Sequence, residues 1–110
     1  MKNVVEFFSK KKLIFKSLNE IDKTLLKTRK KIKIYSSTDI DKNYHCIFIV
    51  EQKSRFLLKN AQDLDILDIS LQKLENHNFK YKHLIISENI CSKSVSYLED
   101  RGWKFYHDFV

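Results

Sequence analysis

The sequence predicts a single α/β domain in which a mixed central sheet is flanked by helices. Its 110 residues are 43% apolar and 13% aromatic, which is enough to build one hydrophobic core. Segments with the two-residue period of a strand alternate with segments of helical period. There is no proline and only one glycine, so no linker composition divides the chain. The expected domain spans residues 1–110 in the order αββαβαβ.

The first predicted helix begins at a capping box, Ser17-Leu18-Asn19-Glu20, in which the serine hydroxyl and the glutamate carboxylate satisfy reciprocal backbone donors. Basic residues follow near Lys30, where cations favour the end of a helix. These signals predict a helix from Leu18 to about Lys30, and segment 3–15 is expected to be helical too. The apolar residues that recur at helical spacing are Leu18, Ile21 and Leu25.

A β-hairpin is predicted next. Ile32 and Ile34 alternate with lysines, which is the period of a half-buried strand. Residues 38–43 are typical of a turn, and a second strand follows from Tyr44 to Glu51. Its continuous apolar run, Cys46–Val50, indicates a central strand that is buried on both faces.

The remaining chain predicts a helix, a strand, a short helix and a last strand. Asn60 is expected to cap a helix through Asn76, with the carboxylates of Asp63, Asp65 and Asp68 on a solvated face. Strands are expected over 83–87 and 103–109. Between them, Ser92 begins the short helix and Gly102 ends it in the left-handed conformation.

The net charge of +7 is concentrated in the first third of the chain. Residues 1–33 hold eleven Lys and Arg against three acidic residues, a net of +8, and the remaining residues hold ten against eleven, a net of −1. Such a cluster attracts polyanions, so the partner could be DNA, RNA, an anionic membrane or an acidic protein. A solvated lysine-rich surface is the structural alternative. No run approaches the roughly 18 apolar residues of a membrane span, so no segment is expected to cross a membrane, and of these partners the membrane is the one that we do not expect.

The two cysteines do not predict a metal clip. Cys46 and Cys91 are 45 residues apart, and apart from His45 beside Cys46 neither has a histidine or second cysteine at ligand spacing. We expect both to be reduced thiols, which fits the cytoplasm or another reducing intracellular compartment.

A short motif follows the most apolar run of the chain. Glu51-Gln52-Lys53 comes directly after Cys46–Val50, so a carboxylate and an ammonium group two residues apart would point to the same side of a strand. An exposed pair that closes a strand is the structural alternative.

This hairpin, the following strand-helix-strand and the stretch from His83 to Trp103 resemble the PD-(D/E)XK nuclease superfamily over nearly the whole chain, with its restriction-endonuclease-like fold. The resemblance implies that Glu51 is a ligand of Mg²⁺ or Mn²⁺. It also implies that Lys53 orients or activates the water that attacks a phosphodiester, and it implies a further acidic metal ligand.

The expected hairpin geometry supplies no second carboxylate opposite Glu51. Glu51 should lie opposite Lys30 or Lys31, whereas ten residues separate it from Asp41, on the order of 33 Å at about 3.3 Å per residue. Glu20 would have to swing in from the first helix, or a bulge or altered register would have to bring in Asp39. The candidate metal ligands are therefore Glu51, Glu20 and Asp39.

Three functions fit these observations. The first is a metal-dependent endonuclease that binds nucleic acid, DNA rather than RNA, and cuts near Glu51 and Lys53. The second is a catalytically inactive nuclease-fold module that binds nucleic acid or an assembly partner such as a polymerase. The third is a small basic accessory or inhibitor protein that binds a protein partner. The phosphate-binding candidates are Lys27, Arg29, Lys30, Lys31 and Lys33.

Overall fold

A computed structural model of the chain describes residues 4–11, 13–22, 32–51, 54–86 and 89–107. The elements run in the order αβββαβαβ, with one more strand than the sequence predicts. They are α1 (Val4–Ser9), β1 (Phe15–Ile21), β2 (Ile32–Asp39), β3 (Tyr44–Val50), α2 (Leu58–Glu75), β4 (Tyr81–Ile85), α3 (Ser92–Glu99) and β5 (Trp103–Tyr106).

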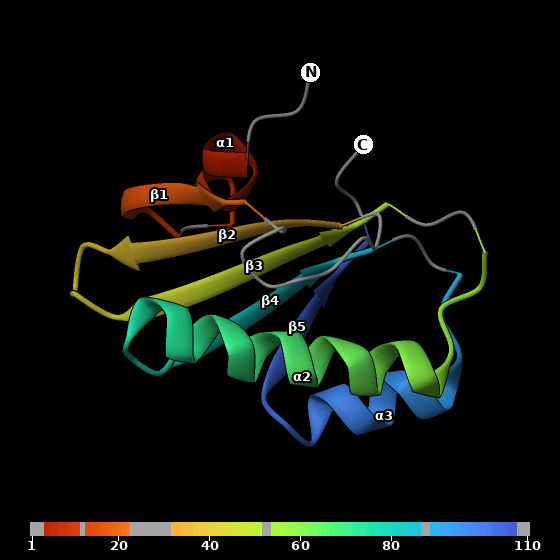
Figure 1. Ribbon diagram of the computed structural model, residues 1–110. Helices are drawn as coiled ribbons and strands as arrows, with labels where there is room; N and C mark the ends of the chain where they lie inside the picture. The colour runs from red at the N-terminus through yellow and green to blue at the C-terminus, as the bar shows by residue number, and fades with distance from the viewer. Residues whose placement is uncertain (1–3, 12, 23–31, 52–53, 87–88, 108–110) are drawn as a thin grey trace.

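The strands form one mixed sheet in the order β1-β2-β3-β4-β5. Strands β1, β2 and β3 are antiparallel neighbours, whereas β4 is parallel to β3 and β5 is parallel to β4. Figure 1 shows α1 on one face of the sheet and α2 and α3 on the other. The predicted mixed sheet between helices is therefore confirmed.

Side chains of the central strand β3 divide the apolar core into two layers. Phe48 and Val50 pack with α2 and α3, while Ile47 and Ile49 pack with α1. This alternation is the two-residue period of a strand whose faces are both covered. It confirms that β3 is the buried centre of the sheet.

The predicted helix from Leu18 to Lys30 is wrong over its described part, because this segment forms the edge strand β1. Phe15, Leu18 and Ile21 are three residues apart, which is also a helical spacing. A register shift between Phe15 and Ser17 lets Phe15 and Leu18 pack together on the α1 side, while Ile21 packs on the opposite side. Residues 23–31 lie outside the described residues, and α1 is shorter than the predicted 3–15 segment.

The other predicted elements are present with shifted boundaries. Helix α2 begins two residues before Asn60, whose side-chain oxygen accepts a hydrogen bond from the Leu57 backbone N–H at 2.9 Å. Asn76 follows the helix in the left-handed conformation, with φ of 60°. Gly102 has φ of 86°, which glycine adopts without steric cost. The predicted positive φ of Gly102 is confirmed, although α3 ends earlier, at Glu99, with Asp100 as its C-cap.

Asp68 departs from the expected solvated face of α2. It is 1% exposed, and its carboxylate accepts hydrogen bonds from Lys82 Nζ at 2.8 Å and from Gln72 Nε2 at 3.0 Å. The period of the helix turns this position toward β4, and Lys82 reaches it from the sheet. The prediction of a solvated side chain is wrong here because a buried ion pair bridges helix and sheet.

Candidate functional site

Three strands end around one cavity of about 530 Å³ at the Glu51 end of the sheet. Ile21 pairs with Ile34 across β1 and β2, and Ile32 pairs with Val50 across β2 and β3. Glu20, Lys33 and Glu51, which are next to these paired residues in the sequence, therefore lie around the same cavity. The cavity is lined by Glu20, Ile21, Asp22, Ile32, Lys33 and Glu51, which we call the acidic end.

Tyr35 lies close enough to two carboxylates of the acidic end for both to raise its pKa. It pairs with Glu20 on β1, and its hydroxyl donates a hydrogen bond to the Glu20 carboxylate. Burial raises the pKa of Tyr35, Glu20 raises it further, and the charge of Glu51 adds to the effect. Glu20 and Glu51 therefore both act on the same hydroxyl group.

The structure brings together part of the predicted site. Glu51 and Lys33 are exposed beside Glu20, which arrives from strand β1 and not from a helix. Asp22 and Ile32, the last and first described residues around segment 23–31, both line the cavity. The other predicted residues, Lys27, Arg29, Lys30, Lys31 and Lys53, lie outside the described residues, as does the expected pairing of Glu51 with Lys30 or Lys31.

Asp39 lies at the opposite end of β2 from this cavity. Strands β2 and β3 pair residue by residue from Ile32 with Val50 to Thr38 with Tyr44. No altered register in this hairpin carries Asp39 toward Glu51. The structure therefore does not bring these two predicted metal ligands together.

Asp39 instead begins a chain of hydrogen-bonded side chains on the α1 face, which we call the histidine relay. Asp39 Oδ2 lies 2.8 Å from His45 Nε2, and His45 Nδ1 lies 2.8 Å from His83 Nε2. His83 Nδ1 lies 3.0 Å from the Tyr106 hydroxyl. Strands β2, β3, β4 and β5 each contribute one residue, so the relay crosses four adjacent strands.

The protonation of the relay follows from its surroundings. The hydrogen bond from His45, together with the backbone N–H groups of Asn43 and Asp41, lowers the pKa of Asp39 to about 2. Burial and the neighbouring His45 and Lys104 lower the pKa of His83 to about 3. When His45 is neutral, an anionic Asp39 gives one direction of donation: His45 to Asp39, His83 to His45, and Tyr106 to His83.

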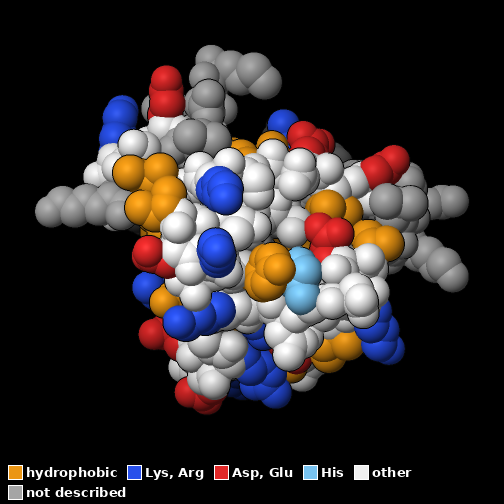
Figure 2. Space-filling model, turned by 90° about the vertical axis from the view of Figure 1, so that its left-hand side faces the viewer, with side chains coloured by type: hydrophobic (Ala, Val, Ile, Leu, Met, Phe, Trp, Pro, Cys, Tyr) orange, Lys and Arg blue, Asp and Glu red, His pale blue; other side chains and the backbone are white. Residues whose placement is uncertain are grey.

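A second cavity, of about 350 Å³, adjoins the relay. Its wall includes the four relay residues and the side chains of Lys11 and Lys104. Figure 2 looks onto the β2–β3 turn end of the molecule, where an imidazole lies beside an apolar or aromatic side chain, with several Lys or Arg side chains to its left and below it and an acidic side chain above it. Tyr44 and His77 stack with ring centroids 3.7 Å apart, and Tyr44 is 43% exposed.

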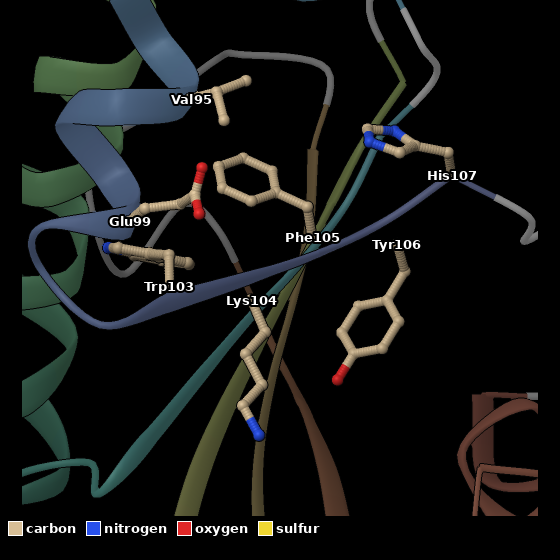
Figure 3. Close-up of a pocket in the computed structure, with 7 residues that line it drawn as sticks. All are labelled: Val95, Glu99, Trp103, Lys104, Phe105, Tyr106 and His107. Atoms are coloured by element: carbon tan, nitrogen blue, oxygen red, sulfur yellow. The ribbon is translucent and has the colours of Figure 1, made fainter.

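Tyr106 belongs to an edge strand, and its ring turns toward the α1 face. Figure 3 shows Phe105 on the side of α3 with Glu99 and Val95, and Tyr106 on the other side of β5. These residues also line a third, shallow cavity of about 520 Å³. The alternation along β5 is what places the Tyr106 hydroxyl against His83.

Sequence reasoning missed the histidine relay because its members are far apart along the chain. His45 and His83 carried a weak signal, since each is a polar residue within an apolar strand segment. A buried polar side chain requires a hydrogen-bond partner. The distance between His45 and His83 along the sequence does not indicate that the two side chains form a hydrogen bond with each other.

The acidic end offers oxygen ligands, the type that Mg²⁺ prefers. Among the described residues, however, there is no group of three histidine, cysteine, aspartate or glutamate side chains placed to hold a metal ion. The described part of the chain therefore does not form a metal centre by itself. Within the same residues, no helix has the length and apolar character needed to cross a membrane.

No protein-family model and no curated protein matches the chain. The fold is similar to the crystal structure of a repair endonuclease from Pyrococcus abyssi, with a TM-score of 0.50 and 16% sequence identity. The similarity covers 68% of this chain and 32% of that one, so this chain matches about a third of the length of the endonuclease. The likeness concerns the fold alone: this α/β domain has a nuclease-like fold.

Proposed function

We propose that this protein binds nucleic acid, with the sugar-phosphate backbone held at the acidic end of its nuclease-like fold. The observation that carries the proposal is that strands β1, β2 and β3 end around one cavity, whose lining includes Asp22 and Ile32, the described residues before and after segment 23–31. That segment contains Lys27, Arg29, Lys30 and Lys31. Cations at a polyanion site release counterions on binding, which drives association without reading sequence.

Lys33 supports this assignment from the described part of the chain. It is exposed on β2 and lines the cavity beside Glu20 and Glu51. This lysine offsets part of the charge of the three carboxylates that line the cavity, Glu20, Asp22 and Glu51, which repel phosphates. The same lysine would contact phosphate oxygens as a point charge, which positions the backbone without specifying a base.

The test is fluorescence anisotropy with labelled single-stranded and duplex oligonucleotides over a range of salt concentrations. Reversal of Lys27, Arg29 and Lys30 to glutamate is expected to abolish binding while the fold is retained. The matched control reverses three exposed lysines on the helices, Lys59, Lys73 and Lys93, and changes the net charge by the same amount.

The result expected is a log–log salt slope of about −4 for four or five phosphate contacts. Binding should fall below detection in the first variant, and the slope should persist in the control. Equal losses in both variants would mean that net charge alone governs binding, and unchanged affinity in the first would end the proposal.

A second candidate function is divalent-metal-dependent phosphodiester cleavage. The specific observation that favours it is that Glu20 and Glu51 line the same cavity and both raise the pKa of Tyr35. The described residues supply this pair without a third ligand, so the metal would need a further donor.

Calorimetric titration with Mn²⁺ and plasmid nicking in its presence test this candidate. Binding and nicking that disappear in Glu51→Gln and Glu20→Gln, and persist in Glu99→Gln, would support an active nuclease. Nucleic-acid binding that is insensitive to the metal would support an inactive module.

A further inference from the structure

We propose that Tyr106 is a nucleophile that the histidine relay activates toward the phosphorus atom of a phosphate ester. This activity goes beyond nucleic-acid binding at the acidic end and does not depend on it. The proposal uses a nucleophile, a base that touches it, and a group that holds the base in place. That arrangement is the structural signature of covalent catalysis.

The nucleophile and its base are in contact. The Tyr106 hydroxyl lies 3.0 Å from His83 Nδ1, within the distance over which a proton passes directly. His83 is 2% exposed, so water does not compete for that nitrogen. Tyr106 itself is half-buried, lies on the edge strand β5 and lines the cavity beside the relay.

His45 and Asp39 are positioning residues that determine where the proton goes. His45 Nδ1 lies 2.8 Å from His83 Nε2, and His45 Nε2 lies 2.8 Å from Asp39 Oδ2. Asp39 is held in turn, because its Oδ1 accepts two backbone N–H groups at 2.9 Å each. Burial disfavours a charge on His83, whereas an imidazolium at His45 would lie directly against a carboxylate.

In the proposed covalent step, His45 begins as a neutral imidazole with its proton on Nε2, toward Asp39. The Tyr106 oxygen forms a bond to phosphorus and the bond from phosphorus to the leaving group breaks, with its electron pair leaving on that group. The hydroxyl proton moves to His83 Nδ1 while the Nε2 proton of His83 moves to His45 Nδ1. The products are a phosphotyrosyl ester and a His45 imidazolium paired with Asp39.

The charges around the cavity favour a phosphate ester as the electrophile. Lys11 Nζ lies 5.6 Å from the centroid of the Tyr106 ring, and Lys104 lines the same cavity. Ammonium groups that line this cavity would stabilise charge on a phosphoryl group bound in it. The other titratable side chains that face this cavity are Asp41 in the β2–β3 turn and Tyr81 on β4.

The test is covalent labelling of the full chain with a fluorophosphonate ester, followed by peptide mass spectrometry. Fluoride is then the leaving group, so the labelling reaction requires no second proton transfer. Tyr44 serves as an internal control, because it is 43% exposed and lies outside the relay. We expect Tyr106 to be labelled at neutral pH faster than Tyr44 by on the order of a hundredfold.

The pH profile separates activation from mere accessibility. An ordinary phenol reacts through its phenolate, so its labelling rises about tenfold per pH unit below a pKa near 10. We expect the labelling of Tyr106 to change little between pH 7 and pH 9. Asp39→Asn keeps the size of the side chain but removes the charge that holds the proton, so labelling should slow at least about tenfold and acquire the profile of a phenol.

Tyr106→Phe should remove the label, and hydrogen exchange would show that each variant is folded. If His83→Gln does not fold, the comparison between wild type and Asp39→Asn still decides the question. Labelling of Tyr106 no faster than that of Tyr44 would overturn the proposal, and so would an unchanged rate and profile in Asp39→Asn. Either result would leave the relay as a satisfied polar network that stabilises the sheet.

Discussion

The two ends of the α1 face of the sheet carry polar groups in opposite ways. At the acidic end, Glu20 and Glu51 are exposed around an open cavity. In the histidine relay, Asp39, His45 and His83 are at most 6% exposed, and each has a hydrogen-bond partner in the relay. Exposed charges contribute little to stability, whereas buried polar groups are costly to leave unpaired. The acidic end is therefore open to a ligand, and the relay is part of the core.

The largest loss of stability is expected when a side chain of the histidine relay is truncated. His83→Ala leaves a cavity and removes the partners of His45 and Tyr106. We expect it to lower the free energy of unfolding by about 3 to 5 kcal/mol in urea denaturation. Glu51→Ala at the acidic end should change it by less than about 0.5 kcal/mol. Equal costs would contradict the distinction between the two ends.

The same difference between buried and exposed polar groups should hold on the face of the sheet that α2 and α3 cover. Asp68→Asn removes the charge that Lys82 contacts at 2.8 Å within the core, and we expect a loss of about 3 kcal/mol. Asp65→Asn disrupts an ion pair with Arg101, whose side chain is 42% exposed, and should cost less than about 1 kcal/mol. Thermal and urea unfolding of the two variants measure the difference. A smaller loss for Asp68→Asn than for Asp65→Asn would contradict the assignment of a buried pair.

The stability of the protein should decrease in mild acid because of the relay. The pKa of His83 is lowered to about 3, against about 6.5 for an unfolded histidine. The unfolded chain therefore binds a proton that the folded chain does not, and stability present above pH 6.5 is lost progressively toward pH 3. The expected slope is about 1.4 kcal/mol per pH unit, or about 2 to 3 kcal/mol between pH 6.5 and pH 4.5.

Urea unfolding at several pH values checks this prediction. His83→Gln should remove most of the slope, whereas His77→Gln should retain it, because His77 lies outside the relay. A wild-type stability that is flat across this range would mean that His83 takes up a proton in the folded state.

The smallest effect tests the geometry of the acidic end. The Glu20 carboxylate accepts a hydrogen bond from the Tyr35 hydroxyl, and the charge of Glu51 also raises the pKa of Tyr35. Glu20→Gln should therefore lower the pKa of Tyr35 toward its usual value. Glu51→Gln should lower it less, and Glu99→Gln should leave it unchanged. Tyrosine ring carbon shifts followed by NMR through the alkaline range report the titration. If the pKa of Tyr35 does not change in Glu20→Gln, then Glu20 does not lie against Tyr35, and the described geometry of the acidic end is wrong.

The parts of the fold that the sequence predicted correctly have local causes. The continuous apolar run of β3 required two covered faces, and the leucines of α2 repeat over several turns. Strand β1 was missed because Phe15, Leu18 and Ile21 have a spacing that fits a helix as well as a bulged strand. Only the pairing of β1 with β2 decides between these interpretations.

The site was predictable to a similar degree. Glu51 was placed at the end of β3 from the chain alone, and Glu20 was expected to approach it, although from a helix. The histidine relay was not predictable, because Asp39, His45, His83 and Tyr106 are brought together by the order of four strands. Strand order is a tertiary property that the spacing of single residues does not encode.

The most direct test of the central claim is an amide NMR titration of the protein with a short oligonucleotide. If the backbone of a nucleic acid binds at the acidic end, the largest chemical-shift changes should lie at Glu20, Asp22, Lys33 and Glu51. Changes concentrated instead at Tyr44, His77 and Lys80, at the β2–β3 turn end, would contradict that claim.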